Sequence, residues 1–531
     1  MTRLQLMACL ILSAGPVAAQ STPAPAEAWW GHITALADDS MRGRETGSPE
    51  HRKAAEYVAA AFQRAGLAPA GVDGWFQPVR FQVRRIDEDR SSVALVRGGK
   101  PRALVLGKDA TINLRGSGEG SVDAPLVFAG YGLHAPDQGL NDFAGLDLKG
   151  KMVVLLSGVA PKSVPGPELA AARSAGTGVI QSSGAVGVVS VFNAQGDLPW
   201  SRYAQSRLHP QMRLSSEPPP KGPVLLSVVM NPERAEELFA GSSHSYAALR
   251  ALADSGAPLP RFNLKTGLRA KAALQQDSAV SDNVVGLLPG SDPALRAEYL
   301  VLTAHLDHLG VGEAVSGDSI YNGAMDNASG IATLIETAGA LGRRTPKLRR
   351  SVLFVAVTAE EKGLLGSDYF AGHPTIPSGT LVANLNTDMF LPINPLHRLL
   401  VNGLEESDLS DDVRRAAGRV GVEVVTDPEP ERNAFVRSDQ FSFIRRGIPA
   451  LSLKVGFTRD SPEHERVLAW RHQRYHGVDD ETDQPIDRQA AADFNRLYAE
   501  LVTEIANRPT RPAWYPTSAF RPEGQGTAER R

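Results

Sequence analysis

The segment SVLFVAVTAEEKGLLGS, residues 351–367, decides the fold class, because seven mostly apolar residues lead directly into two adjacent carboxylates. The apolar run has the length of a strand, and its continuity indicates burial on both faces of a sheet. Glu360 and Glu361 then belong either to a solvated loop at the strand's end or to a functional site. The rest of the sequence distinguishes these two interpretations.

Strand and helix patterns alternate along the second half of the chain. EYLVLTAH (298–305) and TLVANLN (380–386) are further strand candidates, whereas 329–341 and 487–507 carry apolar residues at helical spacing. This alternation predicts an α/β domain with a mostly parallel or mixed central sheet, flanked by helices on both faces.

The domain organisation is predicted from the chain length and from changes in local composition. A chain of 531 residues is too long for one ordinary core, which predicts two domains or a domain with a large insertion. From 115 to 265, short β-like runs such as APLVFAGYG and AVGVVSVF are separated by Gly and Pro, which indicates an inserted β-rich unit. We expect 20–114 and 266–508 to form the other domain, and the Pro-rich segment 509–531 to be a flexible tail.

The first residues, MTRLQLMACLILSAGPVAAQ, predict a cleaved export signal over 1–19, because Arg3 precedes an apolar stretch that ends in small residues. The protein is therefore expected to be exported, either to a periplasm or out of the cell. No later segment reaches about 18 uninterrupted apolar residues, so no membrane span is expected. Cys9 is the single cysteine and lies in the signal, which leaves no disulfide for the mature chain.

The charge balance narrows the class of partner. The chain has 56 basic and 59 acidic residues and a net charge of -3. It therefore lacks the basic footprint of a protein that binds nucleic acid or an anionic membrane surface. Small molecules or peptides are the expected partners.

Histidine and acidic residues gather at the ends of the predicted strands. In open α/β sheets, ligands bind outside the carboxyl ends of the strands. Imidazole and carboxylate without thiolate suit zinc, with manganese or cobalt as chemically possible substitutes. Crowded carboxylates raise one another's pKa unless cations neutralise them, so the charges favour two ions over one. The residues are His305, Asp307, His308, Asp326, Glu360, Glu361, Asp388 and His476.

In this order and spacing, HLDH, GAMDNASG, TAEEKGLLGS, NTD and YHGVDD resemble the motifs of a known family. The family is that of the exported zinc aminopeptidases with a co-catalytic dinuclear site, which also contains the glutamate carboxypeptidases. The unit 115–265 resembles the protease-associated (PA) domain that some members carry as an insertion. LADDSMRGRETGSPEHRKAAEYVAAAFQRAGL, residues 36–67, resembles the family's N-terminal helix. The resemblance implies the zinc-exopeptidase fold and spans nearly the whole mature chain.

The resemblance also implies a ligand set for two Zn²⁺ ions. His305 and Asp388 would bind one ion, Glu361 and His476 would bind the other, and Asp326 would bridge the two.

Other roles are implied in the same way. Glu360 would be the general base, Asp307 would orient His305, and Tyr475 would help to hold the oxyanion, although a packing role suits Tyr475 equally. The resemblance suggests a cis peptide bond between Asp326 and Asn327.

Several further residues near these motifs are not assigned as metal ligands. We predict that His308 is a loop residue and that His464 and His472 are solvated. Gln440 stands where many family members have histidine, which leaves its role open.

The expected function is removal of the N-terminal residue from peptides with a free N-terminus, their ammonium group being held by acidic groups near Glu360 and Asp388. One alternative is a carboxypeptidase of the same family, for which Arg432, Arg437 and Arg459 could hold a terminal carboxylate. The other is a receptor-like homologue without catalysis.

Overall fold

The computed structural model describes residues 25–114, 118–157, 161, 164, 166–192, 199–218, 225–376 and 378–522. The predicted export signal, 1–19, lies outside these residues. None of the described helices combines the length and the apolar character that a bilayer crossing needs.

A ten-stranded mixed sheet forms the larger half of the molecule. Its strands are β1 (Ala68–Pro69), β2 (Phe76–Ile86), β11 (Gln211–Leu214), β14 (Leu274–Leu288), β15 (Glu298–His305), β18 (Ser351–Val357), β19 (Thr380–Asn386), β20 (Arg398–Asn402), β21 (Glu423–Val425) and β22 (Ala450–Val455). Their order is β11-β2-β14-β18-β15-β19-β22-β20-β21, and β1 pairs with β14. β15 lies parallel to β18 and β19, and β22 is parallel to β19. The predicted mostly parallel or mixed sheet is confirmed.

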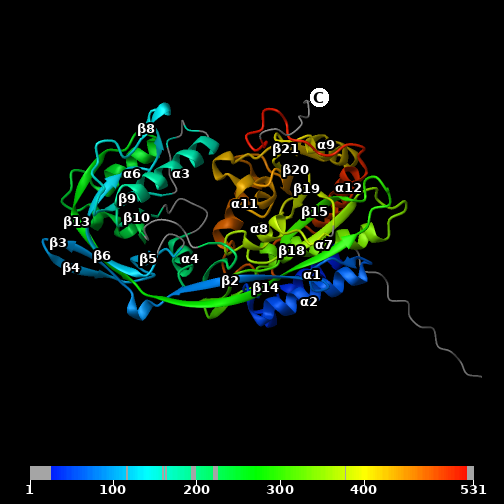
Figure 1. The fold of residues 1–531 in the computed structure, drawn as a ribbon, viewed down its shortest axis with the longest axis horizontal. Coiled ribbons are helices and arrows are strands. Elements are labelled where there is room, and N and C mark those ends of the chain that lie inside the picture. Colours follow the sequence, from blue (N-terminus) through cyan, green and yellow to red (C-terminus); the bar gives the residue numbers. More distant parts are fainter. Residues whose placement is uncertain are drawn as a thin grey trace, which may run out of the picture.

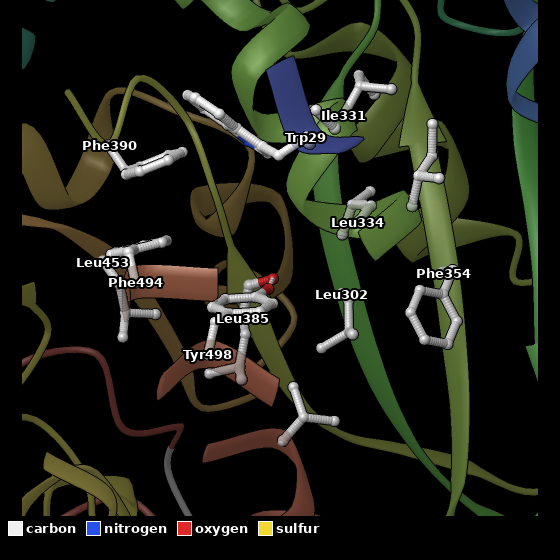
Figure 2. Packing of buried hydrophobic residues seen from close by; sticks show 14 of the residues in the cluster. Trp29, Leu302, Ile331, Leu334, Phe354, Leu385, Phe390, Leu453, Phe494 and Tyr498 are labelled. Atoms are coloured by element: carbon white, nitrogen blue, oxygen red, sulfur yellow. Dashed lines mark hydrogen bonds between the residues drawn. The ribbon is translucent and has the colours of Figure 1, made fainter. Parts of the chain in front are cut away.

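Helices cover both faces of this sheet, as predicted. On one face lie α1 (Pro25–Leu36), α2 (Pro49–Arg64), α7 (Ser329–Gly342) and α12 (Arg488–Asn507), with α9 (Leu409–Val420) against α12. Figure 2 shows their core, in which Leu334 of α7 lies toward Leu302 of the sheet and Phe494 of α12 lies beside Leu385. On the other face, α8 (Leu365–Gly372) and α10 (Gln440–Ile444) pack through Phe370 and Phe443. Because successive strand residues point to opposite faces, both sides of the apolar strands are buried.

A second, eight-stranded sheet has its own hydrophobic core. Its strands are β3 (Ser92–Arg97), β4 (Lys100–Leu104), β5 (Ala110–Ile112), β6 (Gly120–Ala129), β9 (Met152–Leu156), β10 (Gly187–Val191), β12 (Leu226–Met230) and β13 (Arg261–Ala272). The helices α3 (Gly166–Ser182), α5 (Ala235–Phe239) and α6 (Tyr246–Ser255) belong to this unit, and β7 (His134–Ala135) pairs with β8 (Leu140–Asn141). The sheet begins at Ser92, before the expected boundary at 115, because β3, β4 and β5 pair within it.

Two long strands join the halves. β13 is followed after one residue by β14, and β2 pairs with β14 from Ile86↔Leu274 to Phe76↔Val284. Figure 1 shows this ribbon running from one half of the molecule to the other. Between the halves lie α4 (Trp200–Gln205) and the hairpin of β16 (Gly310–Val315) and β17 (Asp318–Tyr321).

The described part of the tail corrects the expectation for 509–531. The side chain of Trp514 is fully buried, and its indole N–H donates to the carbonyl of Gly447 at 2.8 Å. Arg511 Nε donates to Glu298 Oε1 at 2.7 Å. The Pro-rich composition suggested a flexible segment, but the two aromatic residues Trp514 and Tyr515 attach it to the larger half. Residues 523–531 lie outside the described chain.

Arg44 joins the N-terminal segment to two loops that carry site residues. Its side chain is fully buried, and its guanidinium donates to the carbonyls of Leu306 (2.9 Å), Asn322 (2.7 Å), Gly323 (3.0 Å) and Leu36 (2.5 Å). Burial lowers the pKa of Arg44 to about 10, so the group remains charged at neutral pH. One side chain thus satisfies four buried carbonyls.

We expect Arg44→Met to lower the free energy of unfolding by at least about 3 kcal/mol, because these carbonyls would lose a charged donor inside the protein. Urea unfolding followed by tryptophan fluorescence measures the change. Arg42→Met is the matched control, because the Arg42 side chain is 56% exposed. Its ion pair with Glu50 is long, with 3.8 Å between its Nε and Glu50 Oε1. Equal losses in the two variants would contradict this role of Arg44.

Candidate metal centre

The predicted site residues meet at the carboxyl ends of three parallel strands. His305 is the last residue of β15, Asp388 follows β19, and Glu360 and Glu361 follow β18. Asp326 lies just before α7, and its cis peptide bond to Asn327 is present as expected. The strand directions therefore bring together residues that are far apart in sequence.

One group of donors surrounds His305. Its Nε2 lies 3.2 Å from Asp326 Oδ1 and 3.5 Å from Asp388 Oδ1. The side chains of His305, Asp326 and Asp388 are 1%, 3% and 11% exposed. The three donor atoms lie close enough to share one metal ion.

A second group lies on the other side of Asp326. His476 Nε2 is 3.1 Å from Asp326 Oδ2 and 3.3 Å from Glu361 Oε1. The carboxylate of Asp326 therefore directs one oxygen to each group. All five residues that the resemblance assigned as ligands are brought together.

His308 lies in the loop after β15, as predicted, but this loop brings it to the site. Its side chain is fully buried, and its Nδ1 lies 2.9 Å from Glu361 Oε1. The chain does not run out to solvent after β15, because the N–H of His308 donates to the carbonyl of Arg44 at 3.4 Å. Apolar Leu306 and Leu309 on either side were the available sequence signal for burial.

The donor set fits a cation. Among the described residues, Glu361 Oε1, Asp388 Oδ1 and both ring nitrogens of His308 are buried without a hydrogen-bond partner. Buried polar atoms are normally satisfied. Asp388 belongs to one donor group, and Glu361 and His308 lie together in the other, at 2.9 Å but without hydrogen-bond geometry. Carboxylate and imidazole donors without thiolate suit zinc.

The role predicted for the Asp307 side chain is wrong. His305 Nδ1 lies 3.0 Å from the main-chain carbonyl oxygen of Asp307 and not from its carboxylate. The carboxylate instead accepts the N–H groups of Glu360 (3.1 Å) and Glu361 (3.3 Å) and the hydroxyl of Thr46 (2.9 Å). Strand alternation does not reach Asp307 because β15 ends at His305. Asp307 thus positions the main chain of the two glutamates.

Asp480 supports the centre and was missed from the sequence. Its carboxylate accepts the N–H groups of Met325 (2.9 Å) and Asp326 (3.0 Å) and the amide of Gln484 (2.7 Å). Burial raises the pKa of Asp480 to about 6. The only sequence signal was the second acidic residue in YHGVDD.

The two adjacent glutamates differ electrostatically. Burial raises the pKa of Glu360 well above its usual range, and Glu361 adds to the effect. Burial acts in the same direction on Glu361, but the rings of His476 and His308 outweigh it and hold the pKa of Glu361 well below its usual range. Burial also raises the pKa of Asp439, a third carboxyl close to His305, to about 7.

Two other residues considered from the sequence, Gln440 and His464, are buried and have structural contacts. Gln440 is fully buried, donates to the carbonyl of Phe435 at 2.9 Å, and accepts from the amide of Asn386 at 2.8 Å. His464 is 6% exposed and stacks on Phe457, so the prediction that it is solvated is wrong. It lies in α11 (Pro462–Gln473), which turns the ring inward.

The β-rich unit touches the loop that carries His476. Arg202, from α4, donates to the carbonyls of Tyr475 (2.8 Å) and Gln473, and its guanidinium lies against Gly477. Burial raises the pKa of Tyr475 to about 12, and its ring lies 4.0 Å from that of His476. The segment between β10 and β12, which carries α4, therefore contacts the larger half beside the candidate centre.

The fold and the centre define a class: an α/β protein with two adjoining carboxylate–imidazole groups at its strand ends. Residues 283–502 match the model of peptidase family M28. This segment includes all five predicted ligands and Glu360.

Curated relatives match over parts of their length. A probable zinc metalloprotease of Leptosphaeria maculans is 36% identical over 107 residues, which cover 20% of this chain and 24% of that protein. Aminopeptidase YwaD of Bacillus subtilis is 25% identical over 249 residues, 46% of this chain and 48% of that protein. The chain thus spans less than half the length of these relatives in each match.

A solved structure matches over nearly the whole chain. The aminopeptidase from Aneurinibacillus sp. strain AM-1 aligns with a TM-score of 0.56 and 20% identity, covering 92% of this chain and 95% of that chain. At this identity the likeness establishes the fold.

We expect Asp307→Ala to weaken zinc binding by roughly 10- to 100-fold, as is typical when a residue that orients the ligands is removed. The variant leaves the N–H groups of Glu360 and Glu361 without their shared acceptor. Zinc affinity is measured by competition with a chromogenic chelator. Asp147→Ala is the control, because that carboxylate is 75% exposed. Unchanged affinity in Asp307→Ala would contradict the assignment.

Proposed function

We propose that this protein is an exported dinuclear zinc aminopeptidase that removes the N-terminal residue of peptides. The observation that carries the proposal is the Asp326 carboxylate, which directs one oxygen to each of two donor groups beside Glu360. The family M28 segment supports a peptidase, and the name of the Bacillus subtilis relative supports an aminopeptidase. A complete donor set favours an enzyme over a receptor-like homologue.

The proposed ligand assignment follows the two donor groups. His305 and Asp388 would hold one ion, Glu361 and His476 would hold the other, and Asp326 would offer one carboxylate oxygen to each. His308 lies as near to Glu361 as His476 does, so it is a second imidazole available to that ion.

The residues divide the chemistry of peptide hydrolysis among them. Bound zinc supplies Lewis acidity, which polarises the scissile carbonyl group and activates a water molecule. Glu360 takes the proton of the attacking water on a carboxylate oxygen and transfers it to the departing amine nitrogen as the C–N bond breaks. Tyr475, which lines the cavity beside the centre, would donate a hydrogen bond from its hydroxyl group to the oxyanion.

The eight-stranded unit, in the region of the insertion predicted over 115–265, is proposed to be a PA domain. Its contact through Arg202 with the loop of Tyr475 and His476 supports a role in shaping access to the centre. The predicted signal over 1–19 is the basis for export to a periplasm or out of the cell.

A carboxypeptidase is the second candidate, because Arg432 and Arg437 line a cavity beside the centre. Arg459, the third candidate from the sequence, is not among the lining residues and donates to the carbonyl of Pro428.

The direction of attack is tested with blocked peptides. We expect N-acetylation to slow hydrolysis of a leucyl peptide by roughly 10- to 100-fold or more, because it removes an ammonium held by charged acceptors. C-terminal amidation should have little effect when the peptide is long enough for its C-terminus to lie outside the cavity beside the centre. Product analysis by mass spectrometry measures both rates. The reverse pattern would establish the carboxypeptidase instead.

The roles of the two glutamates separate in a second experiment. We expect Glu360→Gln to retain zinc and to lose roughly 100- to 10,000-fold in kcat, the usual contribution of a general base. Glu361→Ala should lose zinc as well as activity. Atomic absorption gives the zinc content per chain, with Glu313→Gln as the exposed control. Equal zinc loss in the two variants would overturn the division of roles.

A further inference from the structure

A cavity of about 130 Å³ adjoins the metal centre and has space for a side chain rather than for a single water. His305, Glu360 and Asp388 are part of its lining, so a substrate bound at the centre reaches into it. We call it the adjoining cavity. Much of its remaining wall is apolar and includes Leu391, Leu400, Phe457, Val467 and Trp470.

A cationic side chain stands on one wall of the adjoining cavity. Lys454 lies on β22, opposite Leu400 of β20, and Ser452 lies opposite Asn402. All four residues line the cavity. Residues two apart on a strand share a face, so this part of the sheet directs Lys454 and Ser452 toward the substrate side.

The other charged groups of the cavity are mostly engaged with one another. Arg471 Nη1 lies 2.7 Å from Glu429 Oε2, and Arg432 Nη1 lies 3.8 Å from the same oxygen. Outside the metal centre, the lining has four cationic side chains, Lys454, Arg432, Arg437 and Arg471, against two carboxylates, Asp427 and Glu429. The cavity therefore has an excess of positive charge.

Two of these four cations, Lys454 and Arg437, form no ion pair with a carboxylate within the described part of the chain, and Lys454 is the less exposed of the two. The charged groups that act on Lys454, Asp388 among them, do so without a hydrogen bond to its ammonium among the described residues. Burial lowers the pKa of Lys454, while Asp388 opposes the change. Asp388 is itself a proposed zinc ligand. A partly buried ammonium with no counter-ion gains most from an anionic ligand.

We propose that the adjoining cavity is a carboxylate-binding subsite in which the ammonium of Lys454 pairs with an anionic group of the peptide substrate. This inference rests on the proposed peptidase function and adds its substrate class. The carboxylate is either the acidic side chain of an N-terminal Glu or Asp or the C-terminal carboxylate of a short peptide. A neutral group in the same position leaves the ammonium unpaired, which is the kind of penalty that gives strong discrimination.

Two matched substrate pairs distinguish the sources of the carboxylate. Glutamyl and glutaminyl p-nitroanilides are close in shape and differ in side-chain charge, whereas Leu-Leu and Leu-Leu-amide differ in the charge of the C-terminus. We expect kcat/KM of the zinc-loaded full chain to be at least about tenfold higher for the charged member of one pair. A preference in the first pair identifies an acidic N-terminal residue, and one in the second identifies a terminal carboxylate. No preference in either pair would overturn the inference.

Variants at Lys454 tie the preference to this side chain. Lys454→Met should abolish it, and Lys454→Arg, which keeps the charge, should retain most of it. Lys265→Met is the control, because Lys265 is exposed on β13 of the second sheet. Thermal unfolding and zinc content are measured for each variant. If Lys454→Met does not fold, Lys454→Gln replaces it. A preference that survives loss of the charge would overturn the inference.

Failure of the subsite and failure of the proposed function give different results. Hydrolysis of leucyl p-nitroanilide with no charge preference leaves the aminopeptidase standing and removes the subsite. If no substrate is cleaved, calorimetric titration of the zinc-loaded protein with free glutamate and free glutamine tests the subsite directly. Binding of glutamate at least about tenfold tighter than glutamine, lost in Lys454→Met, supports it, and equal binding overturns it.

Discussion

Electrostatic repulsion among three buried carboxylates is the constraint on which the rest of the centre depends. Asp326, Glu361 and Asp388 are each at most 11% exposed at the side chain and share one small volume. Like charges at this spacing and burial raise one another's pKa unless cations offset them. The rings of His305 and His476 face the carboxylates, which raise the pKa of both imidazoles well above the usual range, against the effect of burial. A donor set of this kind is stable as an anion only in the company of positive charge, which is why it indicates metal rather than a solvated loop.

The surrounding structure holds the carboxylates together despite their repulsion. Asp307 and Asp480 act on main-chain N–H groups next to the ligands, and Arg44 acts on the carbonyls of the loops before and after them. These contacts fix the backbone of the loops, and the fixed backbone keeps the ligand side chains in their orientation. Groups that hold a metal ligand in place commonly matter almost as much as the ligand itself. The ordered loops are therefore as much a part of the centre as its donor atoms.

The sequence predicted the strand ends and the candidate ligands, but it did not predict the contacts that hold these residues in place. Continuous apolar runs such as 351–357 and the helical spacing in α7 and α12 depend on local pattern, and the sheet and helices follow from them. His308, Asp307 and Trp514 depend instead on contacts with distant segments. His308 is buried because the carbonyl of Arg44 binds its main-chain N–H. The carboxylate of Asp307 binds the N–H groups of the two glutamates because β15 ends at His305. Trp514 is buried where its indole N–H donates to the carbonyl of Gly447. Lys454 gave no signal, because a lysine in an apolar strand looks like a solvated edge residue until the cavity beside it is seen.

The position of Arg202 links the second sheet to the chemistry. Its guanidinium donates to two main-chain carbonyls in the loop of His476. Gly477 allows this close approach, because a Cβ at that position would lie 3.0 Å from the guanidinium carbon. His476 itself has a positive φ of 53°, a conformation that costs a non-glycine residue free energy and is retained where neighbouring contacts determine it. The β-rich unit supplies one of those contacts. The insertion is thus joined to the fold by more than its two connecting strands, and any movement of α4 would act first on the loop that carries an imidazole of the centre.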